Sequence, residues 1–155
     1  MSKKRGQVSF EYLSIVTFGI VIILIAVYTF FSYSMNSNDQ FIASRIEETG
    51  YNIVENIETL YYTTGEGSSI HIKVNFPENV KAVYLVDNGG ESEFVIEYSI
   101  NRGRSEAIFF TPIFLNASED YGAGKTFFLD GEQHSGAVKI KLTNVEGGVY
   151  IEESI

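Results

Sequence analysis

The chain has 155 residues, of which 11 are basic and 20 acidic, so its net charge is −9 at pH 7 with neutral histidines. This acidic balance argues against nucleic-acid binding, which requires a basic surface. The absence of cysteine excludes disulfide bonds, thiol nucleophiles and thiolate metal sites. The length allows one N-terminal helix and one compact domain of about 90 residues.

The N-terminal region combines a basic cluster with a long apolar run. Lys3-Lys4-Arg5 comes first, a single carboxylate follows at Glu11, and residues 13–31 carry no charge. At about 1.5 Å per helical residue this run reaches roughly 28 Å, close to a bilayer core of roughly 30 Å. Basic residues ahead of such a run favour a cytoplasmic N-terminus. Residues 13–31 are therefore predicted to span a membrane.

A short motif overlaps the start of this run. Residues 7–13 read Gln-Val-Ser-Phe-Glu-Tyr-Leu and follow a basic leader that ends in Gly6. The segment resembles the class III signal peptide of archaeal type IV pilin-like proteins, whose pattern is Q-x-S-x-E-Y-L. The fixed positions of that pattern are met by Gln7, Ser9, Glu11, Tyr12 and Leu13.

The resemblance implies a processing site and a role for the helix. In that family a prepilin peptidase cuts between the positions of Gly6 and Gln7, so residues 1–6 are lost and the apolar helix is kept. A secretory signal is instead cut behind its apolar region. In such pilins the helix leaves the membrane and packs in the core of a filament. There Glu11 would offset the α-amino group of Gln7 on a neighbouring subunit, a pairing that suits a dry core.

Removal of the leader also changes the charge. Without Lys3, Lys4 and Arg5, 8 basic and 20 acidic residues remain, a net charge of −12. An acidic domain beyond a membrane helix fits a soluble outer surface. The expected location is the cell membrane for the precursor and an extracellular filament for the mature protein.

The helix is predicted to extend over residues 7–62. Residues 32–39 are polar but contain neither Pro nor Gly, the strongest helix breakers. From residue 40 apolar side chains recur at helical spacing between acidic ones, which predicts an amphipathic helix with one buried face. Gly50 costs about 1 kcal/mol relative to Ala inside a helix and is expected to mark a bend.

Residues 63–155 are predicted to form a β-rich head. Residues 63–69 are turn-forming, and from Ile70 the apolar period changes to two. Strands are expected near 70–76, 80–86, 94–100, 107–110, 114–115, 127–129, 138–142 and 149–151, with turns at 87–91, 101–104 and 147–148. No crossover helix is evident between them. The predicted fold is α+β: a long N-terminal helix packed on an antiparallel β-sandwich-like head.

The sequence of the head contains no recognisable catalytic or metal-binding motif. His71 and His134 are the only histidines and lack metal-ligand spacing, so no metal site is predicted. There is no nucleophile elbow and no evident acid–base pair, so neither an enzyme nor a cofactor is expected. Asn116-Ala117-Ser118 is a sequon, which makes Asn116 a candidate for N-glycosylation.

Three functional hypotheses remain. The favoured one is a structural pilin, with a prepilin peptidase, other pilin subunits in a helical homo-oligomer and, before assembly, the membrane as its partners. The second is a minor pilin or adhesin with a surface ligand. The third is a single-pass, membrane-anchored extracellular β-domain whose leader matches by coincidence.

Overall fold

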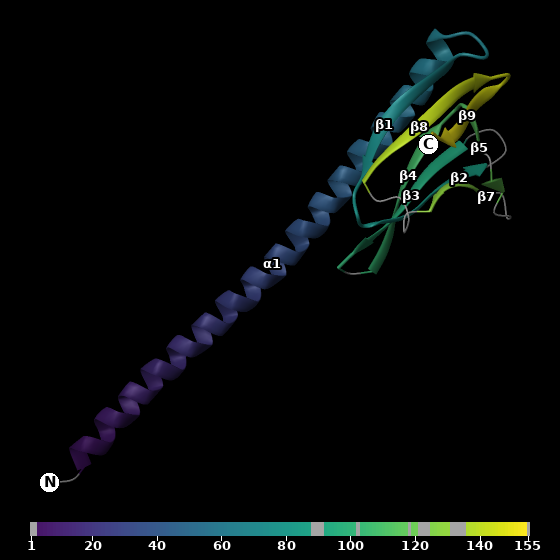
Figure 1. The fold of residues 1–155 in the computed structure, drawn as a ribbon. Coiled ribbons are helices and arrows are strands. Elements are labelled where there is room, and N and C mark those ends of the chain that lie inside the picture. Colours follow the sequence, from purple (N-terminus) through teal and green to yellow (C-terminus); the bar gives the residue numbers. More distant parts are fainter. Residues whose placement is uncertain are drawn as a thin grey trace. The chain divides into compact units, whose positions relative to one another are not determined.

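The structure is a computed structural model that describes the backbone of residues 3–87, 92–101, 103–117, 119–120, 125–130 and 136–154. Side chains are described for residues 10–86, 92–101, 103–117 and 136–154. The chain divides into two compact units, Met1–Asn38 and Asp39–Ile155. The predicted α+β class is confirmed, with one long N-terminal helix and a β-rich head (Figure 1).

Helix α1 includes Lys3–Thr63 and has a different character in each unit. It continues through the polar residues 32–39, as predicted. In the second unit one face of the helix turns inward, and its buried residues follow the helical period: Ile42, Ile46, Ile53, Ile57 and Leu60. The amphipathic prediction for residues 40–62 is therefore confirmed.

The described strands form two sheets. The four-stranded sheet has the order β1 (Ser69–Phe76), β8 (Gly136–Val145), β9 (Gly148–Glu153), β5 (Phe114–Ala117). The five-stranded sheet has the order β4 (Gly103–Thr111), β3 (Ser92–Ile100), β2 (Val80–Asp87), β7 (Lys125–Asp130), β6 (Glu119–Asp120). Each predicted strand is present, and β6 is an addition that the sequence pattern did not indicate.

One strand pair departs from the antiparallel prediction. β5 pairs with β9 in parallel, with Phe114 opposite Gly148, whereas the other pairs among the described strands are antiparallel. β4 and β5 belong to different sheets, so residues 112–113 carry the chain from one sheet to the other. At Gly148 a Cβ atom would collide with the backbone carbonyl of Phe114. Glycine there permits the close approach of the parallel pair.

The predicted turns join strands as expected where they are described. Ile100 pairs with Gly103 at the β3–β4 turn, and Gly147 has a φ of 80° between β8 and β9. Glycine adopts this left-handed conformation without steric cost. β2 and β3 pair antiparallel, while residues 88–91 of their predicted turn lie outside the described residues.

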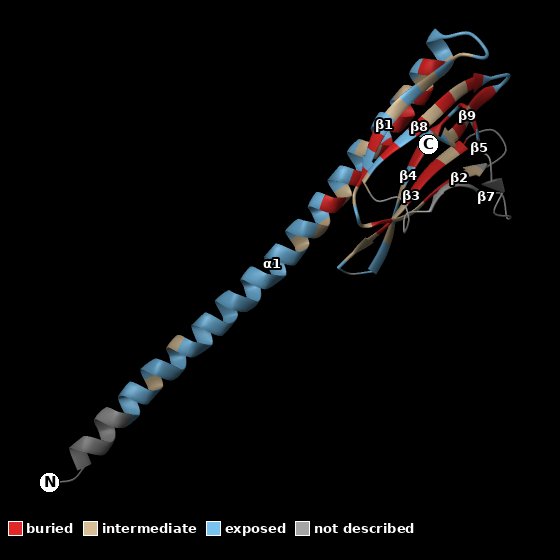
Figure 2. Ribbon diagram, in the orientation of Figure 1, coloured by how far each residue is buried: buried red, intermediate tan, exposed pale blue. Residues whose placement is uncertain are grey.

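The core of the second unit is formed by α1 together with both sheets. Side chains of α1 and the inner faces of both sheets form one buried cluster, and more exposed and more buried positions alternate along β1, β4, β5 and β8 (Figure 2). Gly50 lies in this core, where a Cβ atom would overlap the ring of Phe109. The helix is not interrupted at Gly50. Close packing against Phe109 therefore explains this glycine.

Asn144 connects the end of α1 to the sheet. It is 5% exposed, and its Nδ2 donates to the carbonyl oxygens of Thr64 at 3.1 Å and Leu60 at 3.4 Å. The last carbonyl groups of a helix have no partner within the helix. β8 thus supplies the cap through a side chain that is distant in sequence.

Candidate assembly helix and the outer faces of the head

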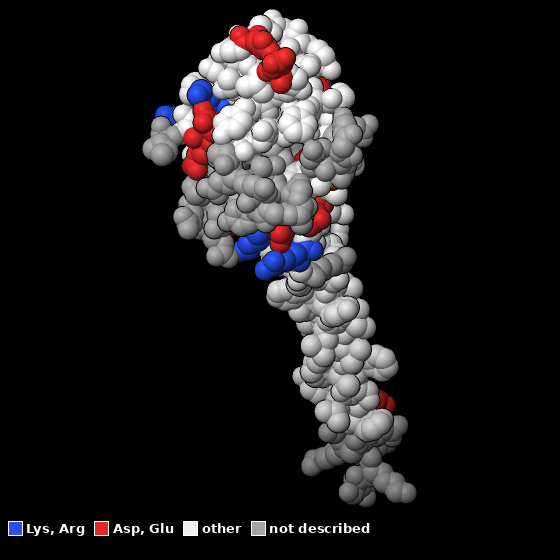
Figure 3. All heavy atoms as spheres, turned by 90° about the vertical axis from the view of Figure 1, so that its right-hand side faces the viewer, with Lys and Arg blue, Asp and Glu red and all other residues white. Residues whose placement is uncertain are grey.

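The first unit presents an apolar helix without a buried side. Its large apolar side chains between residues 10 and 33 are 39% to 76% exposed. Ile22, Ile23, Leu24 and Ile25 are successive, so they point in all directions around the helix. Figure 3 shows the described part of this segment as mostly white, uncharged spheres.

The helix is long and apolar enough to cross a membrane. Its most apolar window of 18 residues has a mean hydropathy of 2.6, and none of that window is buried in the structure. By length and composition, therefore, α1 is compatible with membrane insertion.

The hydroxyl groups inside the apolar run are satisfied within the helix. Ser14 Oγ donates to the carbonyl of Phe10 at 2.9 Å, and Thr17 Oγ1 donates to that of Leu13 at 2.8 Å. Thr29 Oγ1 donates to the carbonyl of Ile25 at 3.0 Å. An unsatisfied hydroxyl is costly in an apolar environment. These bonds allow the whole run to be buried in lipid or protein without leaving these hydroxyls unpaired.

The motif residues lie at the start of α1. Glu11, Tyr12 and Leu13 are all exposed, and Glu11 is the only acidic residue between positions 10 and 38. The backbone of Gly6 and Gln7 belongs to α1. The side chains of Gln7 and Ser9 lie outside the described residues, so their predicted roles remain predictions.

The two candidate positions of the head that are described lie on strands. Asn116 is exposed on β5, and its Oδ1 accepts a hydrogen bond from the N–H of Ala117 at 2.9 Å. The third sequon residue, Ser118, lies outside the described residues. His71 is exposed on β1 opposite Lys141 of β8, and His134 lies outside the described part. Among the described residues, no group of three or more His, Asp or Glu is placed to hold a metal ion.

The outer face of each sheet, meaning the face turned away from the core, carries like-charged residues directly opposite each other. On the four-stranded sheet Lys73 of β1 faces Lys139 of β8, and both are exposed. The next pair along is His71 and Lys141, of which Lys141 forms an ion pair with Glu152 at 2.6 Å.

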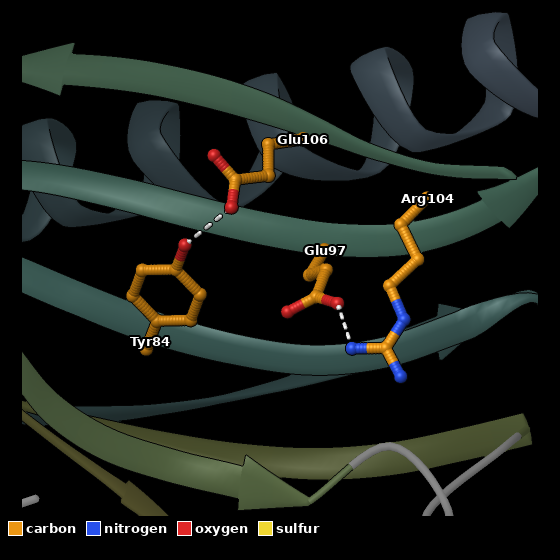
Figure 4. A network of polar contacts seen from close by, with 4 residues as sticks. All are labelled: Tyr84, Glu97, Arg104 and Glu106. Atoms are coloured by element: carbon orange, nitrogen blue, oxygen red, sulfur yellow. Dashed lines mark hydrogen bonds and ion pairs between the residues drawn. The ribbon is translucent and has the colours of Figure 1, made fainter.

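The outer face of the five-stranded sheet has the opposite sign. Glu97 of β3 faces Glu106 of β4. Figure 4 shows their contacts: Arg104 Nη1 lies 3.2 Å from Glu97 Oε1, and the Tyr84 hydroxyl donates to Glu106 Oε1 at 3.0 Å. Burial, and then this hydrogen bond, raise the pKa of Tyr84 from 10.0 to about 12.

Exposed apolar side chains lie beside Glu106 on the same face of the five-stranded sheet. Ile108 and Phe110 follow Glu106 at alternate positions of β4 and are 46% and 63% exposed. β4 is also an edge strand of its sheet. Sequence reasoning recognised the strands but missed these facing pairs, because the register between strands cannot be read from one strand alone.

A polar groove lies between α1 and β1, beside Lys73. It has a volume of about 320 Å³ and is lined by residues of the helix and of the first strand: Arg45, Glu48, Thr49, Asn52, Lys73, Val74, Asn75 and Pro77. Arg45 is exposed, and its guanidinium carbon lies 4.9 Å from the ring centroid of Phe41. Arg45 and Lys73 therefore line the same groove, together with the carboxylate of Glu48.

Comparisons of the chain with protein families, with curated proteins and with solved structures found no match.

Proposed function

We propose that this chain is a structural subunit of an archaeal type IV pilus-like filament. In this proposal the precursor inserts with Lys3–Arg5 in the cytoplasm and a prepilin peptidase removes residues 1–6. The mature helix then leaves the membrane and packs against the helices of other subunits. The observation that carries the proposal is the motif of residues 7–13 at the start of a helix that is apolar on all sides.

The physical properties of the helix support this assembly. A helix that buries on the order of 1,500 Å² against its neighbours gains tens of kcal/mol at roughly 25 cal/mol per Å², before ordering and association costs. The internally bonded hydroxyls of Ser14, Thr17 and Thr29 suit burial in lipid and in a protein core equally well. Repetition of one heterologous contact produces an open filament when the rotation between subunits does not close a ring. The proposed role of the protein is structural, not catalytic.

The decisive experiment determines the N-terminal residue of the native protein by mass spectrometry of cell-surface material. A chain that starts at Gln7 is expected, and Gly6→Val should leave an intact leader on a protein retained in the membrane. A native chain with its leader intact, or one cut beyond Phe31, would refute the proposal.

The second candidate is a single-pass anchored β-domain, which the membrane-compatible length of α1 favours. It requires the same helix but no processing at Gly6. For this candidate, Gly6→Val would change neither the N-terminus nor the amount of protein at the cell surface. A minor pilin or adhesin would instead be processed normally and account for only a small fraction of the subunits in purified filaments.

A further inference from the structure

The two outer faces of the head are each electrostatically unfavourable in an isolated subunit. Two like charges directly opposite in neighbouring strands destabilise a sheet by roughly 0.2–1 kcal/mol. Lys73 and Lys139 form such a pair on the four-stranded sheet, and Glu97 and Glu106 form one on the five-stranded sheet. The described part of the chain provides no ion pair for Lys73 or Lys139.

The local contacts only partly compensate the acidic pair. Arg104 pairs with Glu97, but its side chain is 79% exposed, so solvent weakens this attraction. Tyr84 donates a hydrogen bond to Glu106 but brings no positive charge. A carboxylate pair therefore persists beside Ile108 and Phe110, whose side chains are 46% and 63% exposed.

We propose that these faces dock on each other in neighbouring copies of this chain: the Lys73–Lys139 face of one head contacts the Glu97–Glu106 face of the next. The occupant is a second copy because one chain carries both members of a charge-complementary pair of surfaces. The contact is heterologous, so it can repeat from copy to copy, and it produces an open filament where the rotation between copies does not close a ring. It rests on the proposed function, since it supplies a head-to-head contact for the same filament.

The chemistry of the contact follows from the two surfaces. Each lysine approaches a carboxylate, which replaces two repulsive pairs by attractive ones. Ile108 and Phe110 lose exposed area, which adds an apolar contribution to the electrostatic one. The polar groove beside Lys73 lies at the margin of the basic face, and its lining includes both Arg45 and Glu48.

A charge-swap experiment in cells that produce the protein tests this docking. Lys73→Glu/Lys139→Glu and Glu97→Lys/Glu106→Lys should each lower the yield of surface multimers about tenfold, because like charges then face each other. The chain that carries all four substitutions should recover to within about twofold of the wild type. Glu66→Lys/Glu146→Lys changes two exposed turn residues, alters the net charge as Glu97→Lys/Glu106→Lys does, and should have no effect. Unchanged yields for both single-face variants would overturn the docking.

Cysteine cross-linking provides a second test that does not depend on filament formation or on the stability of charge-reversed variants. The chain has no cysteine, so Lys139→Cys/Glu106→Cys introduces the only two thiols. A short bismaleimide applied to intact cells should then produce a ladder of linked copies, and Lys139→Cys/Glu66→Cys should produce none. Equal ladders from both pairs, or a ladder from neither, would overturn the proposal.

The outcomes for docking and for the proposed function are separable. Filaments of chains that start at Gln7 without the Lys139–Glu106 cross-link would refute the docking and leave the pilin proposal standing. The cross-link on chains with an intact leader would support docking of the heads and refute the pilin proposal.

Discussion

Gly50 is the position at which helix propensity and packing predict opposite effects of one substitution. On propensity alone, Gly50→Ala stabilises a helix by about 1 kcal/mol. In the structure, a Cβ atom at position 50 overlaps the ring of Phe109. Phe109 is 5% exposed, and its ring centroid lies 5.2 Å from that of Tyr51 and 6.2 Å from that of Phe94. The ring therefore cannot move without displacing other aromatic side chains.

The magnitude follows from these two opposing terms. Adding a carbon atom to a packed core costs about 1–3 kcal/mol, and the overlap with a confined ring points to the upper half of that range. After subtraction of about 1 kcal/mol for propensity, Gly50→Ala is expected to lower the free energy of unfolding by about 1–2 kcal/mol.

The assay is denaturant unfolding of the full chain in mild detergent, followed by near-ultraviolet circular dichroism of the aromatic residues. Gly19→Ala is the matched control, because nothing lies within 4 Å of a Cβ atom at Gly19. In a Phe109→Leu background the cost of Gly50→Ala should largely disappear, as a double-mutant cycle would measure. A Gly50→Ala protein as stable as the wild type, or more stable, would refute the reasoning.

Three further predictions concern the cap, the buried tyrosine and the motif. Asn144→Ala should lower the free energy of unfolding by about 0.5–1.5 kcal/mol, because it removes the hydrogen bonds that the buried Asn144 amide donates to the carbonyl oxygens of Thr64 and Leu60, and Asn56→Ala on the helix surface should cost less. The raised pKa of Tyr84 means that its contribution to stability is complete below pH 10.0 and is lost as the pH rises to about 12. In a series of unfolding curves at increasing pH, Tyr84→Phe should therefore lose less stability than the wild type over this range. The same pH dependence in both proteins would contradict the raised pKa of Tyr84. Glu11→Gln should reduce the yield of filaments while the near-ultraviolet spectrum of the head stays unchanged, and a normal yield would count against the role of Glu11 in assembly.

Local periodicity determined much of the fold from the sequence alone. The uncharged run of residues 13–31, the helical spacing after residue 40 and the alternation from Ile70 onward are properties of neighbouring residues. They predicted α1 and the position of most strands, because burying one face of a helix or strand requires such spacing. The motif of residues 7–13 is also local, and the functional proposal therefore begins from the sequence.

Only the tertiary structure decided which distant residues meet. Whether a glycine marks a bend or a close contact depends on the residue opposite it, and for Gly50 that residue is Phe109. The parallel pairing of β5 with β9, the capping of α1 by Asn144 and the facing of Glu97 by Glu106 depend in the same way on strand register. Register is set by how both sheets and the helix share one core, and no single segment of the sequence contains that information.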